Sequence, residues 1–198
     1  LEELVAAFDF AQIHKGGAVF DLKKLDWMNG EYIKKLSVDE LYERVMSGGF
    51  LNKELITNAL EAMKTESYLK RVLSVERERL TKLSDIGELN PFFFATDPVY
   101  DPRKLHWKEN TVEMTRASLE QALALLESLD DATWNDVLLL EEKLLSAAGD
   151  KKGDFLWPLR YALTGADRSP SPPQVAWVLG KNEGVLRVEK ALEKLSVE

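Results

Sequence analysis

The chain has no cysteine and only two histidines, His14 and His106, among its 198 residues. The absence of cysteine excludes disulfide bonds, thiolate metal sites and cysteine nucleophiles, and it fits a reducing compartment. The two histidines lie far apart and lack the spacing of an HExxH motif, so no metal ligand or general base is predicted. No phosphate-binding glycine loop is present either, and a free-standing helical enzyme therefore has little support.

Long apolar runs are also missing. No segment resembles a signal peptide or is apolar over enough residues to span a bilayer. The hydrophobic content of 45% is nevertheless sufficient for a real core in one domain or two small ones. Because the chain begins at Leu1 without an initiator methionine, we expect a soluble fragment of a longer protein.

Cations are outnumbered, with 26 lysines and arginines against 34 acidic residues and a net charge of -8. This balance argues against nonspecific nucleic-acid binding, which depends on many cations neutralising phosphates. It would suit a helical protein-interaction module. The distribution of the cations matters more than their sum, because one local basic face is enough for a specific contact.

Apolar residues recur at helical spacing over most of the chain, and no segment alternates long enough for a strand. Ser37 and Glu40 have the spacing of a capping box, Gly48-Gly49 follows as a stop signal, and Asn52 can cap the next helix. Leucines and valines form one stripe from residue 68 to 83, which predicts a helix over that range. The sequence predicts an all-α fold.

Further capping signals punctuate the second half of the chain. Thr133 with Asp136 is expected to cap a helix that ends near Gly149. Asp154 is expected to start a short helix closed by Gly165, and two more helices should be separated near Gly180.

Two proline-containing connectors divide these helices. Residues 90–102 combine prolines with three consecutive phenylalanines, which indicates a buried hinge, and residues 166–173 form a polar, proline-rich loop. We expect a leading piece over 1–40 and two small helical subdomains over 41–97 and 98–198. Each subdomain is large enough for a core only if the two pack together.

The most basic stretch covers residues 68–82, with five cations against two acids. Taken alone, it predicts a helix in which Arg79 pairs with Glu76 three residues earlier. The alternative is a nucleic-acid contact through the planar guanidinium of Arg79. The two interpretations are compatible, because an ion pair with Glu76 would hold the guanidinium in position.

Two strings are more specific than these patterns: FDLKKLDWMNGEYI at 20–33 and PLRYALTG at 158–165. Taken alone, Trp27 and Met28 indicate a core anchor and Asn29-Gly30 a helix stop. Together the strings resemble glutamyl-tRNA synthetase of the bacterial type, over the region that follows its catalytic domain. The resemblance covers nearly the whole chain and implies an all-α anticodon-binding region after the tail of a stem-contact domain at 1–40.

The resemblance also implies an anticodon-binding site. Arg79 matches the family's arginine that reads the third anticodon base. The residues that match those around the first two bases are Arg160, Ser169, Pro170 and Pro172. Pro172 stands where the family can place a leucine, so this sequence departs from the family's pattern there. The structural alternative for Arg160 is an ion pair with Asp154 or Asp167.

For the parent protein, the resemblance implies a ligase that uses ATP and Mg to attach glutamate to its tRNA. The HIGH and KMSKS motifs of the catalytic domain are absent, so we expect no catalytic residue, cofactor or metal in this fragment and no activity from it alone. The implied partner is the tRNA for glutamate, with no DNA and no membrane, and the implied state is a cytoplasmic monomer. The alternative is a helical protein-interaction module without RNA specificity.

Overall fold

A computed structural model describes residues 2–10, 16, 19–51 and 57–196. The described residues form helices joined by turns and contain no strand, as the all-α prediction requires. The helices and 3-10 turns (η), in chain order, are α1 (Glu2–Ala7), α2 (Leu22–Lys34), α3 (Val38–Ser47), η2 (Glu61–Lys64), α5 (Glu66–Glu76), η3 (Leu83–Asp85), η4 (Pro91–Phe93), η5 (Pro102–Leu105), α6 (Val112–Ser128), α7 (Asp131–Asn135), α8 (Val137–Ala148), α9 (Lys152–Thr164) and α10 (Pro172–Leu195).

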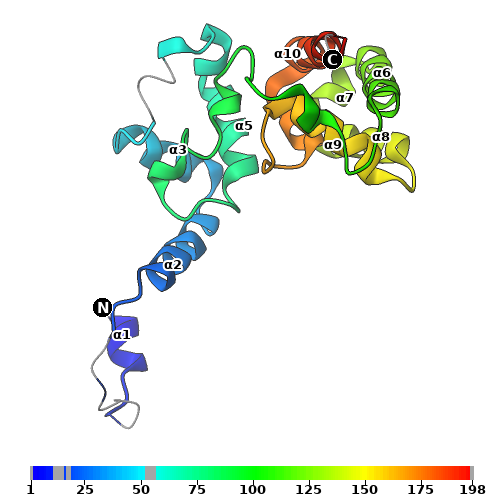
Figure 1. The fold of residues 1–198 in the computed structure, drawn as a ribbon. Coiled ribbons are helices and arrows are strands. Elements are labelled where there is room, and N and C mark those ends of the chain that lie inside the picture. Colours follow the sequence, from blue (N-terminus) through cyan, green and yellow to red (C-terminus); the bar gives the residue numbers. More distant parts are fainter. Residues whose placement is uncertain (1, 11–15, 17–18, 52–56, 197–198) are drawn as a thin grey trace.

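The helices form two adjoining groups, and α1 and α2 extend away from them (Figure 1). The first group contains α3 and α5, and the second contains α6 to α10. In the second group α10 packs against α6, α8 and α9, and α5 of the first group also contacts α10. The larger hydrophobic core runs through both groups, from Leu69 and Val72 on α5 to Leu159 on α9 and Val188 on α10. A smaller core joins Ile33 of α2 to α3 and the end of α5. The boundaries at 40/41 and 97/98 stay a prediction.

Several helix ends lie where the sequence predicts them. Ser37 and Glu40 form the capping box of α3, and that helix ends at Ser47 before Gly48. Gly149 and Gly165 follow the last residues of α8 and α9, and Gly165 has the left-handed conformation (φ 64°) that glycine adopts most readily. The predicted cap at Asn52 lies outside the described residues.

Other boundaries differ from the prediction. The helix expected over 68–83 ends at Glu76, because the Asp85 carboxylate accepts hydrogen bonds from the backbone N–H groups of Thr81 and Lys82 and draws the chain into a turn. Thr133 is not a cap. Asp130 caps α7 and Asp136 caps α8, since a carboxylate accepts N–H bonds at a helix start more strongly than a hydroxyl.

The last two predicted helices are one element in the structure, α10, with a kink at Gly180 (φ 76°, ψ 169°). The helix begins at Pro172, earlier in the proline-rich loop than expected, because Ser171 and Gln174 form a capping box.

The three phenylalanines of the connector are buried, as predicted, whereas its later residues Asp97, Val99 and Asp101 are exposed. Arg187 of α10 is only 1% exposed and donates hydrogen bonds to the carbonyl oxygens of Phe92, Ala95 and Leu163. Its Nε also donates to Glu183 at 2.7 Å. One buried arginine therefore holds the connector against α9 and α10.

Candidate nucleic-acid interface

Arg160 lies on α9 and holds the proline-rich loop closed over that helix. Its Nη1 donates to the Ser169 carbonyl oxygen at 2.9 Å, to Ser169 Oγ at 2.6 Å and to the Pro170 carbonyl oxygen at 3.2 Å. Nε and Nη2 have no hydrogen-bond partner within the part of the chain that the structure describes. Arg160 thus fixes the loop with one nitrogen and keeps two nitrogens, with three N–H donors, available for a ligand.

The structure does not support an ion pair between Arg160 and either predicted carboxylate. Asp154 accepts a hydrogen bond from Asn110 Nδ2 at 3.2 Å, and Asp167 faces Lys104 at 3.9 Å. Both carboxylates therefore have other partners, and the interpretation of Arg160 as a simple surface ion pair is wrong.

The loop itself is rigid for identifiable reasons. Pro170 and Pro172 are both buried, and Ser169 is half-buried with its hydroxyl donating to the Pro170 carbonyl oxygen at 2.7 Å. Pro172 is the first residue of α10, where the fixed φ of proline suits the helix start. The Ser169 hydroxyl and the carbonyl oxygens of Ser169 and Pro170 are held by Arg160, and the two prolines pack inward.

Arg79 lies in the turn after α5 and not on a helix. Its Nη1 lies 3.0 Å from each carboxylate oxygen of Glu76, so the predicted ion pair is present. The Glu76 side chain is fully buried, and burial raises the pKa of its carboxyl, whereas the Arg79 charge and Asn90 lower it. A buried carboxylate needs such a partner, and Arg79 is fixed by supplying it.

Arg79 and Arg160 lie far apart in the sequence, but the charge of one acts on the other. Burial lowers the pKa of the Arg160 guanidinium, and the positive charge of Arg79 lowers it further. The Glu76 carboxylate offsets part of this repulsion because it pairs with Arg79. Arg79 therefore interacts electrostatically with Arg160, which holds Ser169, Pro170 and Pro172 in place, and the role of these residues as anticodon contacts stays a prediction.

The Trp27 string has a structural role that the sequence did not reveal. Trp27 is 62% exposed and Asn29-Gly30 lies inside α2, so the predictions of a core anchor and a helix stop are wrong. Asn29 Nδ2 donates to the Thr81 carbonyl oxygen, and a Cβ placed on Gly30 would lie 3.1 Å from the Leu80 carbonyl oxygen. The string therefore lets α2 pack against the backbone that follows Arg79.

An aromatic surface beside Arg160 is a second feature that sequence patterns did not reveal. The ring centroids of Trp107 and Trp157 lie 4.9 Å apart, and those of Trp157 and Tyr161 lie 5.2 Å apart. One signal was available in the sequence: Trp157 and Arg160 are three residues apart, which puts them on one face of a helix. The position of Trp107 depends on tertiary packing.

The described residues offer little for catalysis or metal binding. No group of three or more carboxylate or imidazole side chains among them is arranged to hold a metal ion. His106 Nδ1 is 2.7 Å from Thr115 Oγ1, and His14 lies outside the described residues. None of the helices in these described residues is both long and apolar enough to cross a membrane.

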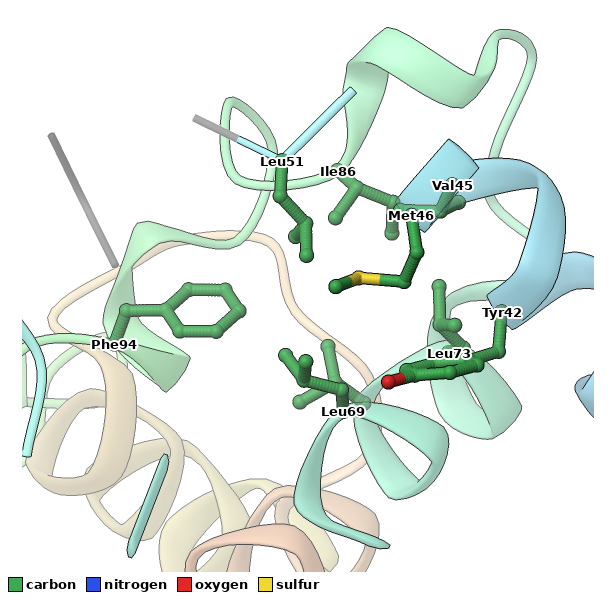
Figure 2. Close-up of a pocket in the computed structure, with 9 residues that line it drawn as sticks. Tyr42, Val45, Met46, Leu51, Leu69, Leu73, Ile86 and Phe94 are labelled. Atoms are coloured by element: carbon green, nitrogen blue, oxygen red, sulfur yellow. The ribbon is translucent and has the colours of Figure 1, made fainter. Parts of the chain in front are cut away.

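An enclosed cavity between α3 and α5 is also unsuited to a ligand. Figure 2 shows apolar side chains such as Met46, Leu69 and Phe94 pointing into it. Its volume is about 10 Å³, which is close to the space of a single water molecule. The polar and charged surface around Arg160 and Arg79 is therefore the candidate site.

The comparisons with known proteins agree with one another. A family model described as an anticodon binding domain matches residues 40–192. Glutamate–tRNA ligases of Clostridium botulinum (strain Eklund 17B / Type B) and Clostridium novyi (strain NT) are 34% identical over 203 residues and 39% identical over 201 residues. Each match covers 98% of this chain and 39% of the relative. The chain thus spans about two fifths of the length of these curated relatives.

Two solved structures share the fold. A glutamate tRNA ligase from Elizabethkingia meningosepticum CCUG26117, in complex with its amino acid, has a TM-score of 0.70 and 24% identity. The match covers 98% of this chain and 36% of that one. The glutamate-tRNA synthetase from Elizabethkingia anophelis has a TM-score of 0.68 at 24% identity, with coverages of 97% and 36%.

Proposed function

This chain belongs to the anticodon binding domain family, and we propose that it binds the anticodon arm of the tRNA for glutamate as part of a glutamate–tRNA ligase. The observation that carries the proposal is the loop that Arg160 holds through Ser169 and Pro170, together with Arg79 held by the buried Glu76.

The chemistry of this site suits unpaired bases. Proteins bind single-stranded bases by placing them on flat or apolar surfaces and by hydrogen bonding to their edges. The N–H donors at Nε and Nη2 of Arg160 supply edge contacts, and the half-buried Ser169 lies beside them on a loop that the buried Pro170 and Pro172 keep in place. Arg160 and this loop bind the first two anticodon bases, and Arg79 binds the third.

Arg79 is suited to a cytosine at the third position. Its guanidinium is planar and can donate to the O2 and N3 acceptors of cytosine, which a lysine ammonium could match only as a point charge. The ion pair between Arg79 Nη1 and the buried Glu76 limits the orientations of the guanidinium. A positioned donor discriminates between bases better than a mobile one.

The net charge of -8 does not oppose this function. Specific contact needs only a few cations at the binding site, and here these are Arg79 and Arg160. The activation of glutamate with ATP and Mg belongs to the remaining part of the parent ligase. The fragment acts as a monomer in the cytoplasm and is inactive alone.

The test is a titration of the chain with transcripts of the tRNA for glutamate and with transcripts whose anticodon alone is changed, at low and at moderate salt. We expect tighter binding of the unchanged anticodon at both salt concentrations, because base contacts are less salt-dependent than phosphate contacts. A protein-interaction module would show no anticodon preference. Equal dissociation constants for both transcripts would therefore contradict the proposed function.

A further inference from the structure

A groove of about 280 Å³ lies beside Arg160, and Arg79 does not line it. Its lining contains two indole rings and two cations but no carboxylate, although the chain as a whole is acidic. The lining residues are Trp107, Lys152, Gly153, Leu156, Trp157, Arg160, Ser171 and Pro172. We propose that this groove binds one further unpaired nucleotide of the anticodon loop, next to the first base of the triplet. The inference rests on the proposed function.

The aromatic wall of the groove is held in place by its surroundings. Trp157 Nε1 donates to the Lys104 carbonyl oxygen at 3.0 Å. A Cβ placed on Gly153 would lie 2.4 Å from Trp107 Nε1, so the indole of Trp107 packs directly on the first turn of α9. An ordered aromatic wall loses little conformational entropy when a ligand binds.

The backbone next to Trp107 carries strain. Lys108 has a φ of 51°, the one positive value among the described residues other than glycine, and its Nζ lies 5.1 Å from the centroid of the Trp107 ring. A lysine in this conformation costs free energy, which the surrounding structure must offset. The turn places a third cation at the edge of the groove.

This combination of indole rings and cations suits a nucleotide. A base packs against indole rings through dispersion and stacking, and its phosphate is neutralised by a nearby ammonium group, here Lys152. The volume is close to about 300 Å³, the lower limit of ordinary small-molecule sites, which suits a single nucleotide. The nearest carboxylate on α9, Asp154, is directed to Asn110.

The position of the groove identifies the nucleotide. Arg160 and Pro172 belong both to the groove and to the proposed site for the first two bases. When the first anticodon base contacts Arg160, the nucleotide next to it therefore enters the groove. This is the nucleotide on the 5′ side, because the second and third anticodon bases continue toward Arg79.

The experiment is a double-mutant cycle between protein and RNA. The RNA is an anticodon stem-loop of the tRNA for glutamate, intact or abasic at the nucleotide on the 5′ side of the triplet. The protein variants are Trp107→Ala and Lys152→Ala, with Lys151→Ala as the matched control, because Lys151 is an exposed neighbour that does not line the groove. Circular dichroism establishes that each variant is folded.

We expect Trp107→Ala to weaken binding of the intact stem-loop by about fivefold to a hundredfold, the range for one lost base stack. The same variant should bind the abasic stem-loop as wild type does. Lys152→Ala should weaken binding of the intact RNA several-fold more than Lys151→Ala does. If Trp107→Ala proves unfolded, Lys152→Ala against Lys151→Ala decides the question alone.

Equal losses on intact and abasic RNA, or no loss from either groove variant, would overturn the inference. If the loss of binding in Trp107→Ala disappears when the first anticodon base is removed instead, that base occupies the groove. This result would also overturn the inference. These failures are distinguishable from failure of the proposed function, because wild type would still prefer the unchanged anticodon and Arg160→Ala would still remove that preference.

Discussion

Arg79 Nη1 lies 3.0 Å from both carboxylate oxygens of Glu76, and the Glu76 side chain is completely buried. An exposed arginine would sample many rotamers, whereas the Arg79 guanidinium is held by the buried Glu76 carboxylate, which needs a cation beside it. The pair thus links the core of the first helical group to the surface on which the proposed third-base contact lies.

The first prediction concerns the titration of Glu76. Its pKa is raised above the ordinary value of 4.5, so the folded protein holds this proton to a higher pH than the unfolded chain does. The free energy of unfolding therefore falls as pH rises through the window between the ordinary and the raised pKa. The side chain of the variant Glu76→Gln cannot titrate. The free energy of unfolding of the variant minus that of wild type should therefore rise with pH across that window and then level off. Urea unfolding from about pH 4 to about pH 7 measures this difference. A pH-independent difference would contradict this account of Glu76.

The second prediction concerns Arg160. Arg160→Ala removes the three hydrogen bonds to the loop and the proposed base contacts. Binding of the tRNA for glutamate should weaken by about 1–3 kcal/mol, with helix content unchanged. Filter binding and circular dichroism measure the two quantities. A similar loss for tRNAs with unrelated anticodons would make Arg160 a phosphate or structural contact instead.

The third prediction concerns Arg187. Arg187→Ala leaves the carbonyl oxygens of the connector without donors and the Glu183 carboxylate without its partner. We expect a loss of about 3–5 kcal/mol in the free energy of unfolding, the range for breaking a buried ion pair. The control is Arg44→Ala on α3, where the arginine is exposed. Comparable losses for both variants would show that Arg187 is not the main link between connector and helices.

The fourth prediction concerns Gly30. Alanine normally stabilises a helix interior relative to glycine by about 1 kcal/mol. At this position the added Cβ would lie 3.1 Å from the carbonyl oxygen of the buried Leu80, so α2 would have to move away from the turn that carries Arg79. We therefore expect a lower melting temperature for Gly30→Ala, measured by thermal unfolding. A higher melting temperature would show that α2 accommodates the methyl group.

Local signals in the sequence predicted much of this fold. The capping box at Ser37, the left-handed Gly165 and the buried phenylalanines at 92–94 each depend on a few neighbouring residues, and the structure has all three. The hydrophobic stripe predicted too long a helix after residue 68, because Leu80 continues to pack into the smaller core although the chain has left the helix.

The candidate site could be predicted only in part. The resemblance singled out Arg79 and Arg160, and the Arg79–Glu76 pair followed from a spacing of three residues. The electrostatic interaction of Arg79 with Arg160, the contact of Gly30 with Leu80 and the pairing of Trp107 with Trp157 all join segments distant in sequence. Such contacts arise from tertiary packing, which leaves no periodic pattern in either segment.

The most direct test of the central claim is the discrimination between the tRNAs for glutamate and glutamine, whose third anticodon bases are cytosine and guanine. The measurement is the ratio of their dissociation constants at one fixed salt concentration, for wild type and for Arg79→Gln. Arg79→Lys serves as the control that keeps the charge but loses the planar donor group. We predict that wild type favours the glutamate tRNA and that Arg79→Gln narrows the ratio, because affinity for the glutamate tRNA falls while affinity for the glutamine tRNA stays equal or rises. An unchanged ratio, with Arg79→Gln lowering only the thermal stability, would contradict the account and would show that Arg79 serves mainly to neutralise Glu76.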